Sequence, residues 1–234
     1  MPKLLLLDVE TAPAIAYIWR LHDENIGLEQ LIEPGRIICW GAKWLGERKV
    51  HYADERDGKR KMFGGIHALM SEAEALVTYN GNCFDIPKLD GAFVEYGFDP
   101  PPPVASIDLY QTVKRLSYQS GKLAFVGPFL KIGAKVKNEG FSLWRSCLEG
   151  DKKAWERMRR YNQQDVRLLD GLYMKLRPYI RNHPYIAATT GKCPACQSDK
   201  AESRGIRKTK RMAIQRLKCG NCGYWYDGNR QRLG

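Results

Sequence analysis

Two carboxylates stand two residues apart at the end of an apolar run. Residues 3–9 are mainly Leu and Val, which predicts a central strand covered on both faces, and Asp8 and Glu10 lie at its end. Side chains at i and i+2 of a strand point to the same face, so the two carboxylates should converge. Because ionised carboxylates this close repel each other, a hard divalent cation such as Mg²⁺ or Mn²⁺ would relieve the conflict. Alone, an Asp-x-Glu pair is also typical of a solvated turn.

A third carboxylate opens a predicted helix. The segment from Asn80 to Asp85 follows a strand predicted at Ala75–Tyr79 and leads into a helix predicted over Asp85–Tyr96. In the first turn of a helix a carboxylate is an ordinary residue that interacts with free backbone N–H groups. Helix capping therefore explains Asp85 if it is taken by itself.

The fourth carboxylate, Asp165, lies inside a long helix predicted over Lys152–Leu176. Tyr161 is one turn earlier on the same helix face, and that face continues in leucines, so Asp165 should lie near the packed side. A buried carboxylate needs a partner. Pairing with Arg159 or Arg167 is the structural alternative to a metal ion.

The other apolar patterns predict a mixed sheet flanked by helices, which is an α/β fold. Further elements are expected at these ranges: strands at Ile37–Leu45, Lys49–Ala53 and Ala105–Leu109, and helices over about 60–73 and 110–116. Gly97 is expected to end the helix that Asp85 begins. The region 118–150 has no pattern clear enough to assign.

Taken together, the three acidic segments resemble the motifs of the DEDD (DnaQ-like) exonuclease superfamily, whose fold is RNase H-like. The Asp-x-Glu that begins at Asp8, the Asn-x3-Phe-Asp that ends at Asp85 and the Tyr-x3-Asp that ends at Asp165 match them in order, over about residues 3–176. Tyr161 stands four residues before the last Asp, which resembles the tyrosine branch (DEDDy) that includes proofreading domains of DNA polymerases.

This resemblance implies a metal-dependent 3′→5′ exonuclease. Asp8, Glu10, Asp85 and Asp165 would hold two Mg²⁺ or Mn²⁺ ions, one activating a water and the other stabilising the departing 3′ oxygen. Tyr161 would orient the attacking water, because a hydroxyl with an ordinary pKa of about 10 suits positioning better than proton removal. Each cycle would release a 5′-mononucleotide.

Three further residues lie in or near the motifs. Asn80 is a candidate contact to the substrate strand or a cap for the following helix. Phe84 is a candidate for stacking on a base, although a core position is favoured. Asp108 has no place among the four acids and is expected to cap the helix after it.

Cysteines suggest a second metal site. Two C-x2-C pairs occupy the last fifth of the chain: Cys193 with Cys196 and Cys219 with Cys222. Four thiolates in this arrangement predict one tetrahedral Zn²⁺ in a zinc ribbon over about residues 190–228. A redox role is disfavoured because no thioredoxin-like unit surrounds either pair. The scattered cysteines are expected to be small core residues: Cys39, Cys83 and Cys147.

The charge is positive and uneven. The chain carries a formal charge of +12, of which residues 188–234, with 11 Lys/Arg and 3 Asp/Glu, contribute 11 − 3 = +8. Basic residues between the cysteine pairs are candidate contacts to nucleic acid: Arg207, Lys208, Lys210 and Arg211. With the aromatic run at 224–226 they suit a single strand. A purely structural module, a basic tail kept for solubility and a docking site for a protein are the alternatives.

The composition, 44% hydrophobic and 27% charged, is typical of globular proteins. No apolar run approaches the roughly 18 residues of a membrane span, and the run at 4–7 is too short for a signal peptide. We therefore expect a cytosolic protein without membrane association. It should consist of an RNase H-like exonuclease domain over 1–185 and a zinc ribbon over 190–234.

The expected activity is hydrolysis of single-stranded or frayed 3′ ends of DNA, with a replication or repair protein as a further candidate partner. The same chemistry on RNA stays open, because no motif reveals contacts to the 2′-OH. A non-catalytic nucleic-acid binding protein is the other alternative. The presence of all four acids and Tyr161 argues against it.

Overall fold

A mixed five-stranded sheet forms the centre of the protein in the computed structural model, which describes residues 3–22, 25–136, 139–181, 183–185, 191–209 and 211–233. The order is β5-β4-β1-β6-β7, with β1 antiparallel to β4 and parallel to β6. The strands are β1 (Leu4–Thr11), β4 (Ile37–Trp44), β5 (His51–Asp54), β6 (Ala75–Thr78) and β7 (Ala105–Asp108). A short hairpin of β2 (Ile15–Ala16) and β3 (Leu31–Glu33) lies between β1 and β4 in the chain.

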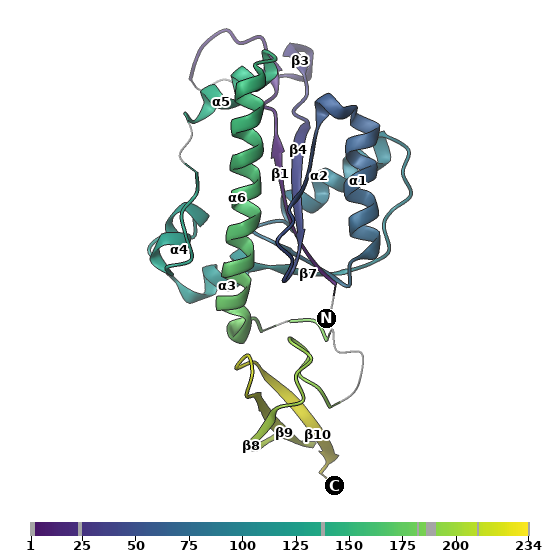
Figure 1. Ribbon diagram of the computed structural model, residues 1–234, viewed down its shortest axis with the longest axis vertical. Helices are drawn as coiled ribbons and strands as arrows, with labels where there is room; N and C mark the ends of the chain where they lie inside the picture. The colour runs from purple at the N-terminus through teal and green to yellow at the C-terminus, as the bar shows by residue number, and fades with distance from the viewer. Residues whose placement is uncertain are drawn as a thin grey trace.

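Helices cover both faces of this sheet (Figure 1). They are α1 (Lys59–Glu72), α2 (Asp85–Glu95), α3 (Leu109–Leu116), α4 (Leu123–Phe129), α5 (Phe141–Leu148) and α6 (Lys152–Leu176). The long α6 lies along one face, and α1 and α2 cover the other. The α/β prediction is confirmed, and the unassigned region 118–150 contains α4 and α5.

Strand β1 is buried on both faces, as its apolar run predicted. Leu4 and Leu6 pack with α6 residues such as Leu169, whereas Leu5 and Leu7 pack against α1 and α2. Because side chains alternate along a strand, the even-numbered residues after Leu6 also face α6. This alternation directs Asp8 and Glu10 toward α6.

The predictions for Gly97, the scattered cysteines and Phe84 hold with two exceptions. Gly97 has φ +67° just after α2, which a glycine adopts readily, so its role as a helix stop is confirmed. Cys39 and Cys147 are buried in an apolar cluster with the start of α6. Cys83 is exposed in the loop before α2, so the core prediction was wrong for it.

The second exception is Phe84, also predicted to be core, whose side chain is 39% exposed. It is the residue before the first turn of α2, and that helix buries a different face, including Leu89 and Phe93. The aromatic ring therefore lies at the surface beside the acidic segment.

A separate three-stranded antiparallel sheet follows α6, in the order β10-β9-β8. Its strands are β8 (Ala201–Lys208), β9 (Met212–Cys219) and β10 (Trp225–Arg232). The His183 ring joins it to α6, since its Nε2 lies 2.8 Å from the Tyr173 hydroxyl and its ring packs on Tyr224. Residues 186–190, at the predicted boundary between the two domains, lie outside the described residues. No helix in the described part of the chain has the length and apolar character to cross a membrane.

Candidate metal centre and active site

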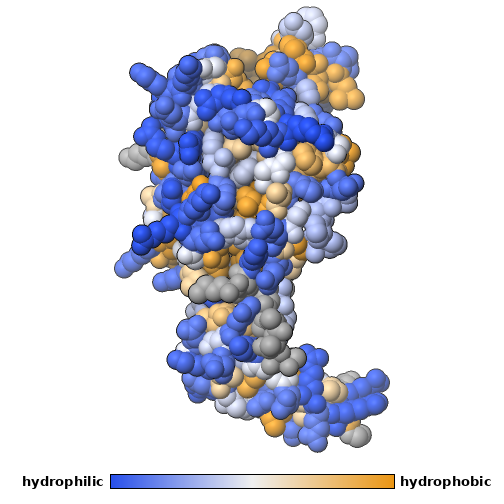
Figure 2. Space-filling view, turned by 45° about the vertical axis from the view of Figure 1, so that its right-hand side comes forward, coloured by the Kyte–Doolittle hydropathy of each residue, from blue (hydrophilic) through white to orange (hydrophobic). Residues whose placement is uncertain are grey.

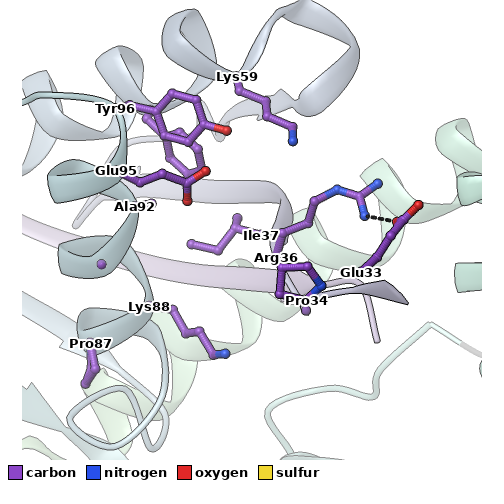
Figure 3. A pocket seen from close by; sticks show the side chains of 13 residues that line it. Glu33, Pro34, Arg36, Ile37, Lys59, Pro87, Lys88, Ala92, Glu95 and Tyr96 are labelled. Carbon is purple, nitrogen blue, oxygen red and sulfur yellow. Dashed lines mark hydrogen bonds and ion pairs between the residues drawn. The ribbon is translucent and has the colours of Figure 1, made fainter. Parts of the chain in front are cut away.

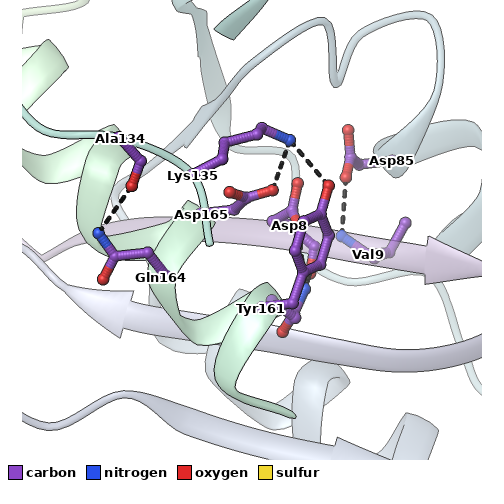
Figure 4. A network of polar contacts seen from close by, with 9 residues as sticks. Asp8, Val9, Asp85, Ala134, Lys135, Tyr161, Gln164 and Asp165 are labelled. Carbon is purple, nitrogen blue, oxygen red and sulfur yellow. Dashed lines mark hydrogen bonds and ion pairs between the residues drawn. The ribbon is translucent and has the colours of Figure 1, made fainter. Parts of the chain in front are cut away.

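Three of the four predicted acids converge in space. Asp8 and Glu10 come from β1 and Asp165 from the middle of α6, and one carboxylate oxygen of each lies within 4.8 Å of the others. Asp165 is only 2% exposed. The leucines that follow it along α6 pack on the sheet, which turns this face of the helix toward β1 (Figure 4).

The fourth acid, Asp85, approaches β1 from α2. Its Oδ1 accepts a hydrogen bond of 2.9 Å from the backbone N–H of Val9, the residue between Asp8 and Glu10. Its carboxylate is not among the three within 4.8 Å, although it is 4% exposed and adjacent to them (Figure 4). A hydrogen bond to a strand 76 residues away is more than a local helix cap.

Burial and mutual repulsion oppose ionisation of this cluster. Burial raises the pKa of Asp8 well above its usual value, and Glu10, Asp85 and Asp165 raise it further. The pKa of Glu10 rises to about 8, through burial and then through the charge of Asp165. That of Asp85 rises to about 6, mainly by burial. Buried oxygen ligands with this unmet negative charge fit a hard divalent cation.

Lys135 supplies a positive charge to the cluster. Its Nζ lies 2.6 Å from Asp165 Oδ2 and 3.0 Å from the Tyr161 hydroxyl (Figure 4). The structural alternative, a pair between Asp165 and Arg159 or Arg167, is not what the structure shows, because the cation beside Asp165 is Lys135. Lys135 lies 30 residues earlier, in the segment between α4 and α5 that the sequence left unassigned. A basic residue in an irregular stretch gives no signal of where it points.

We expect divalent cations to stabilise the protein more at pH 8 than at pH 5. A carboxyl whose folded pKa is raised contributes stability below its unfolded pKa and loses it as pH rises through the folded value. For Glu10 this interval runs from 4.5 to about 8. The melting temperature without Mg²⁺ should therefore fall across this range, and Mg²⁺ should restore it at pH 8.

Thermal unfolding with and without Mg²⁺ at matched ionic strength checks this. Mg²⁺ should be omitted by dialysis, because a strong chelator would also strip a thiolate-bound metal. An equal effect of Mg²⁺ at both pH values would contradict a cation site at these carboxylates.

The loop before α2 is held by hydrogen bonds to Asp108. Asn80 adopts φ +67°, and its backbone N–H donates to Asp108 Oδ1 at 2.8 Å. The residue before the first turn of α2 is Phe84, so Asn80 does not cap this helix. Asp108 also accepts from the N–H of Tyr110, so its predicted role as a cap of α3 is confirmed.

Comparison with known proteins identifies the family. Residues 28–177, which include Asp85, Tyr161 and Asp165, match the RNase H superfamily. The chain belongs to this superfamily. RNase H-like nucleases use divalent metals, with which the acidic cluster is compatible. No curated protein matches the sequence.

A solved structure has the same fold as this RNase H superfamily protein. It is the family B DNA polymerase from the hyperthermophilic archaeon Pyrobaculum calidifontis, with a TM-score of 0.55 and 18% sequence identity. The match covers 76% of this chain and 25% of the polymerase chain. The chain thus spans about a quarter of the polymerase, and the likeness at this identity establishes the fold.

A cavity of about 730 Å³ lies on the other side of the sheet from α6. It is bounded by α1, α2 and the segment from β3 into β4, and the amino groups of Lys59 and Lys88 face it (Figure 3). Arg36 in its wall pairs with Glu33 and Glu55. None of the four acids lines this cavity, so it is distinct from the candidate active site.

The four cysteines of the C-x2-C pairs form a second cluster. The Sγ atoms of Cys193 and Cys222 are 3.7 Å apart, and those of Cys196 and Cys219 are 3.6 Å apart. A zinc tetrahedron with Zn–S bonds of about 2.3 Å has edges of about 3.8 Å, so the spacing fits Zn²⁺. Burial raises the pKa of the Cys193 and Cys222 thiols, whereas N–H donors from Cys222 and Asn221 lower the pKa of Cys219 to about 7 against the effect of burial.

The basic residues of this module lie mostly at its surface. Lys208 and Arg211 are exposed, and Figure 2 shows hydrophilic side chains over much of this end of the protein. Arg207 is paired with Asp227 at 3.1 Å, which offsets part of its charge. Lys210 lies outside the described residues.

Proposed function

We propose that the protein is a 3′→5′ exonuclease that degrades single-stranded or frayed 3′ ends of DNA and releases 5′-mononucleotides. The observation that carries this proposal is the convergence of Asp8 and Glu10 with Asp165, which lies 165 − 10 = 155 residues beyond Glu10, on an RNase H superfamily fold. A buried acidic cluster of this kind costs stability unless a cation compensates it. Its order of motifs supports the tyrosine branch of the DEDD superfamily.

In this proposal the acids hold two Mg²⁺ or Mn²⁺ ions. When bound, the ions would supply a water of lowered pKa and neutralise charge on the departing 3′ oxygen. The proposed ligands whose carboxylates lie together are Asp8, Glu10 and Asp165. The fourth, Asp85, approaches from α2 and accepts a hydrogen bond from the backbone N–H of Val9. Hydrolysis would break the bond between phosphorus and the 3′ oxygen, leaving a new 3′-OH on the strand and a phosphate on the released nucleotide.

Tyr161 would hold the attacking water in place. Burial, followed by the charge of Asp165, raises the pKa of its hydroxyl to about 12, so it stays protonated at neutral pH and acts by hydrogen bonding. Lys135 Nζ donates to this hydroxyl and to Asp165, which fixes the two groups relative to each other. Phe84, exposed at the start of α2, would stack on a base of the substrate.

Tyr161→Phe should lower kcat by about 10–100-fold, because the water would lose its orienting group. The ring should stay in place, since it packs edge-on against Trp144 with centroids 5.7 Å apart. The Mg²⁺ concentration for half-maximal activity should stay unchanged, because the hydroxyl is not a proposed ligand. Tyr179→Phe, at an exposed tyrosine beyond α6, is the matched control. An unchanged kcat in Tyr161→Phe would remove this role.

We also propose that the cysteine module is a zinc ribbon that grips the nucleic-acid strand. The exposed Lys208 and Arg211 support phosphate contacts, and Trp225, which is 47% exposed, supports base stacking. A strand held here would raise the local concentration of 3′ ends at the active site.

Cleavage of 5′-labelled single strands tests the main proposal. With Mg²⁺ we expect a ladder that shortens from the 3′ end, and no products when Mg²⁺ is removed by dialysis. DNA and RNA strands of the same sequence run in parallel, and degradation of RNA alone would change the substrate to RNA with the chemistry retained. Intact strands of both kinds at high protein concentration with Mg²⁺ or Mn²⁺ would reject the nuclease proposal.

A further inference from the structure

Asn162, between Tyr161 and Asp165 on α6, makes direct contact with the acidic cluster. Its side chain is fully buried, and Nδ2 donates to Asp8 twice, at 2.8 Å to carboxylate Oδ2 and at 3.2 Å to the backbone carbonyl oxygen. The opposite amide orientation would set the carbonyl oxygen of Asn162 against two oxygens of Asp8, so the chemistry fixes which end faces the acid. One oxygen of Asp8 is thereby tied to α6.

The other end of the same amide has no partner. Asn162 Oδ1 is buried and makes no hydrogen bond among the described residues. A buried acceptor left unsatisfied costs about 1–3 kcal/mol, which offsets much of what the two hydrogen bonds to Asp8 contribute to the fold. Fold stability alone does not explain an amide here.

Gly41 on β4 provides the space that the amide occupies. It pairs with Asp8 across the β1–β4 ladder. A Cβ built on Gly41 would lie only 2.3 Å from Asn162 Oδ1 and 3.1 Å from Val166 Cγ2. A glycine within a strand often marks such a close approach. Any larger residue at position 41 would push the amide away from Asp8.

We propose that Asn162 is a positioning residue that orients the Asp8 carboxylate for catalysis, and that Gly41 is required to seat it. The inference rests on the proposed nuclease function. A buried donor on one oxygen of Asp8 keeps this carboxylate, which has an oxygen within 4.8 Å of Glu10 and Asp165, from rotating out of the cluster. Asn162 acts through Asp8 and touches no substrate itself.

The first test is Asn162→Leu, which keeps the branched shape of the side chain and removes the donor. We expect kcat to fall by about 10–100-fold and KM for DNA to change by less than about twofold. The melting temperature should change by only a few degrees, because the gain from removing the unsatisfied oxygen offsets the loss of the two hydrogen bonds to Asp8. A merely structural residue would show the reverse, with lower stability and unchanged kcat. Gln163→Leu, the next residue on α6, is the matched control and should retain activity.

The second test is a cycle with Gly41→Ala, which leaves Asn162 present and displaces it. Gly41→Ala alone should lower kcat about as much as Asn162→Ala. Adding it to Asn162→Ala should change kcat by less than about twofold, because the clash is gone and the two sites couple. This arm also tests the inference if the leucine variant does not fold.

Wild-type cleavage of the 5′-labelled strand distinguishes a failure of the nuclease function from a failure of the positioning role of Asn162. No cleavage by the wild type rejects the nuclease function. Cleavage by the wild type together with full kcat in Asn162→Leu, or with additive losses in the Gly41→Ala cycle, overturns the positioning role and leaves the function standing.

Discussion

Asp165→Asn should lower the exonuclease turnover by about 10³-fold or more. A metal ion contributes several kcal/mol of charge stabilisation in a phosphoryl displacement, and about 4 kcal/mol corresponds to a factor of about 10³. Asp165 faces Asp8 and Glu10 from α6, and the asparagine keeps its shape while removing the charge that would hold the cation. Steady-state kinetics on a 5′-labelled strand measures the loss.

The fold should survive this change. Asparagine relieves repulsion with Asp8 and Glu10, although it also removes the ionic partner of Lys135, so the melting temperature should shift by only a few degrees. Glu156→Gln, on the exposed side of α6, is the matched neutralisation and should retain full activity. An Asp165→Asn protein with wild-type turnover would exclude this acid from the reaction.

Cys219→Ser should unfold the C-terminal module and lower the zinc content from one ion per chain to none. Structural Zn²⁺ binding is worth about 10–16 kcal/mol in small modules, and the cluster around Cys219 is a small core. The affinity for single-stranded DNA should fall. The slope of log K against log[salt] should become shallower by about 0.7 for each phosphate contact that is lost. The kcat at saturating DNA should stay within about twofold, because the acids lie on the five-stranded sheet and on two helices packed against it.

Cys83→Ser is the control for this experiment, because Cys83 is exposed and lies outside the four-cysteine cluster. It should keep the zinc and the DNA affinity. If Cys219→Ser lost zinc and kept the same affinity at every salt concentration, the module would have no role in gripping the strand. Its basic surface would then require another explanation.

The parts of the fold that follow local periodicity were predictable from the sequence. The apolar run of β1 requires burial on both faces, and alternation then directs Asp8 and Glu10 to one side. In α6 the leucines define a buried face that carries Asp165 with it. These two patterns meet because the helix and the strand bury their apolar faces against each other.

The features of the site that could not be predicted from the sequence depend on contacts between distant segments. Lys135 lies in a stretch without periodicity, so nothing in its neighbourhood indicates that it reaches α6. The fit between Asn162 and Gly41 depends on the pairing of β1 with β4 and on the position of α6 above them. Phe84 was misjudged because an aromatic residue beside a helix start has no period that tells core from surface.

Diffraction from crystals soaked in Mn²⁺, measured at a wavelength where manganese scatters anomalously, tests the central claim most directly. We predict anomalous density between Asp8, Glu10 and Asp165, with Lys135 displaced from Asp165, and no such density in Asp165→Asn. An unchanged ion pair between Lys135 and Asp165, with no manganese at the acids at high Mn²⁺, would contradict the account.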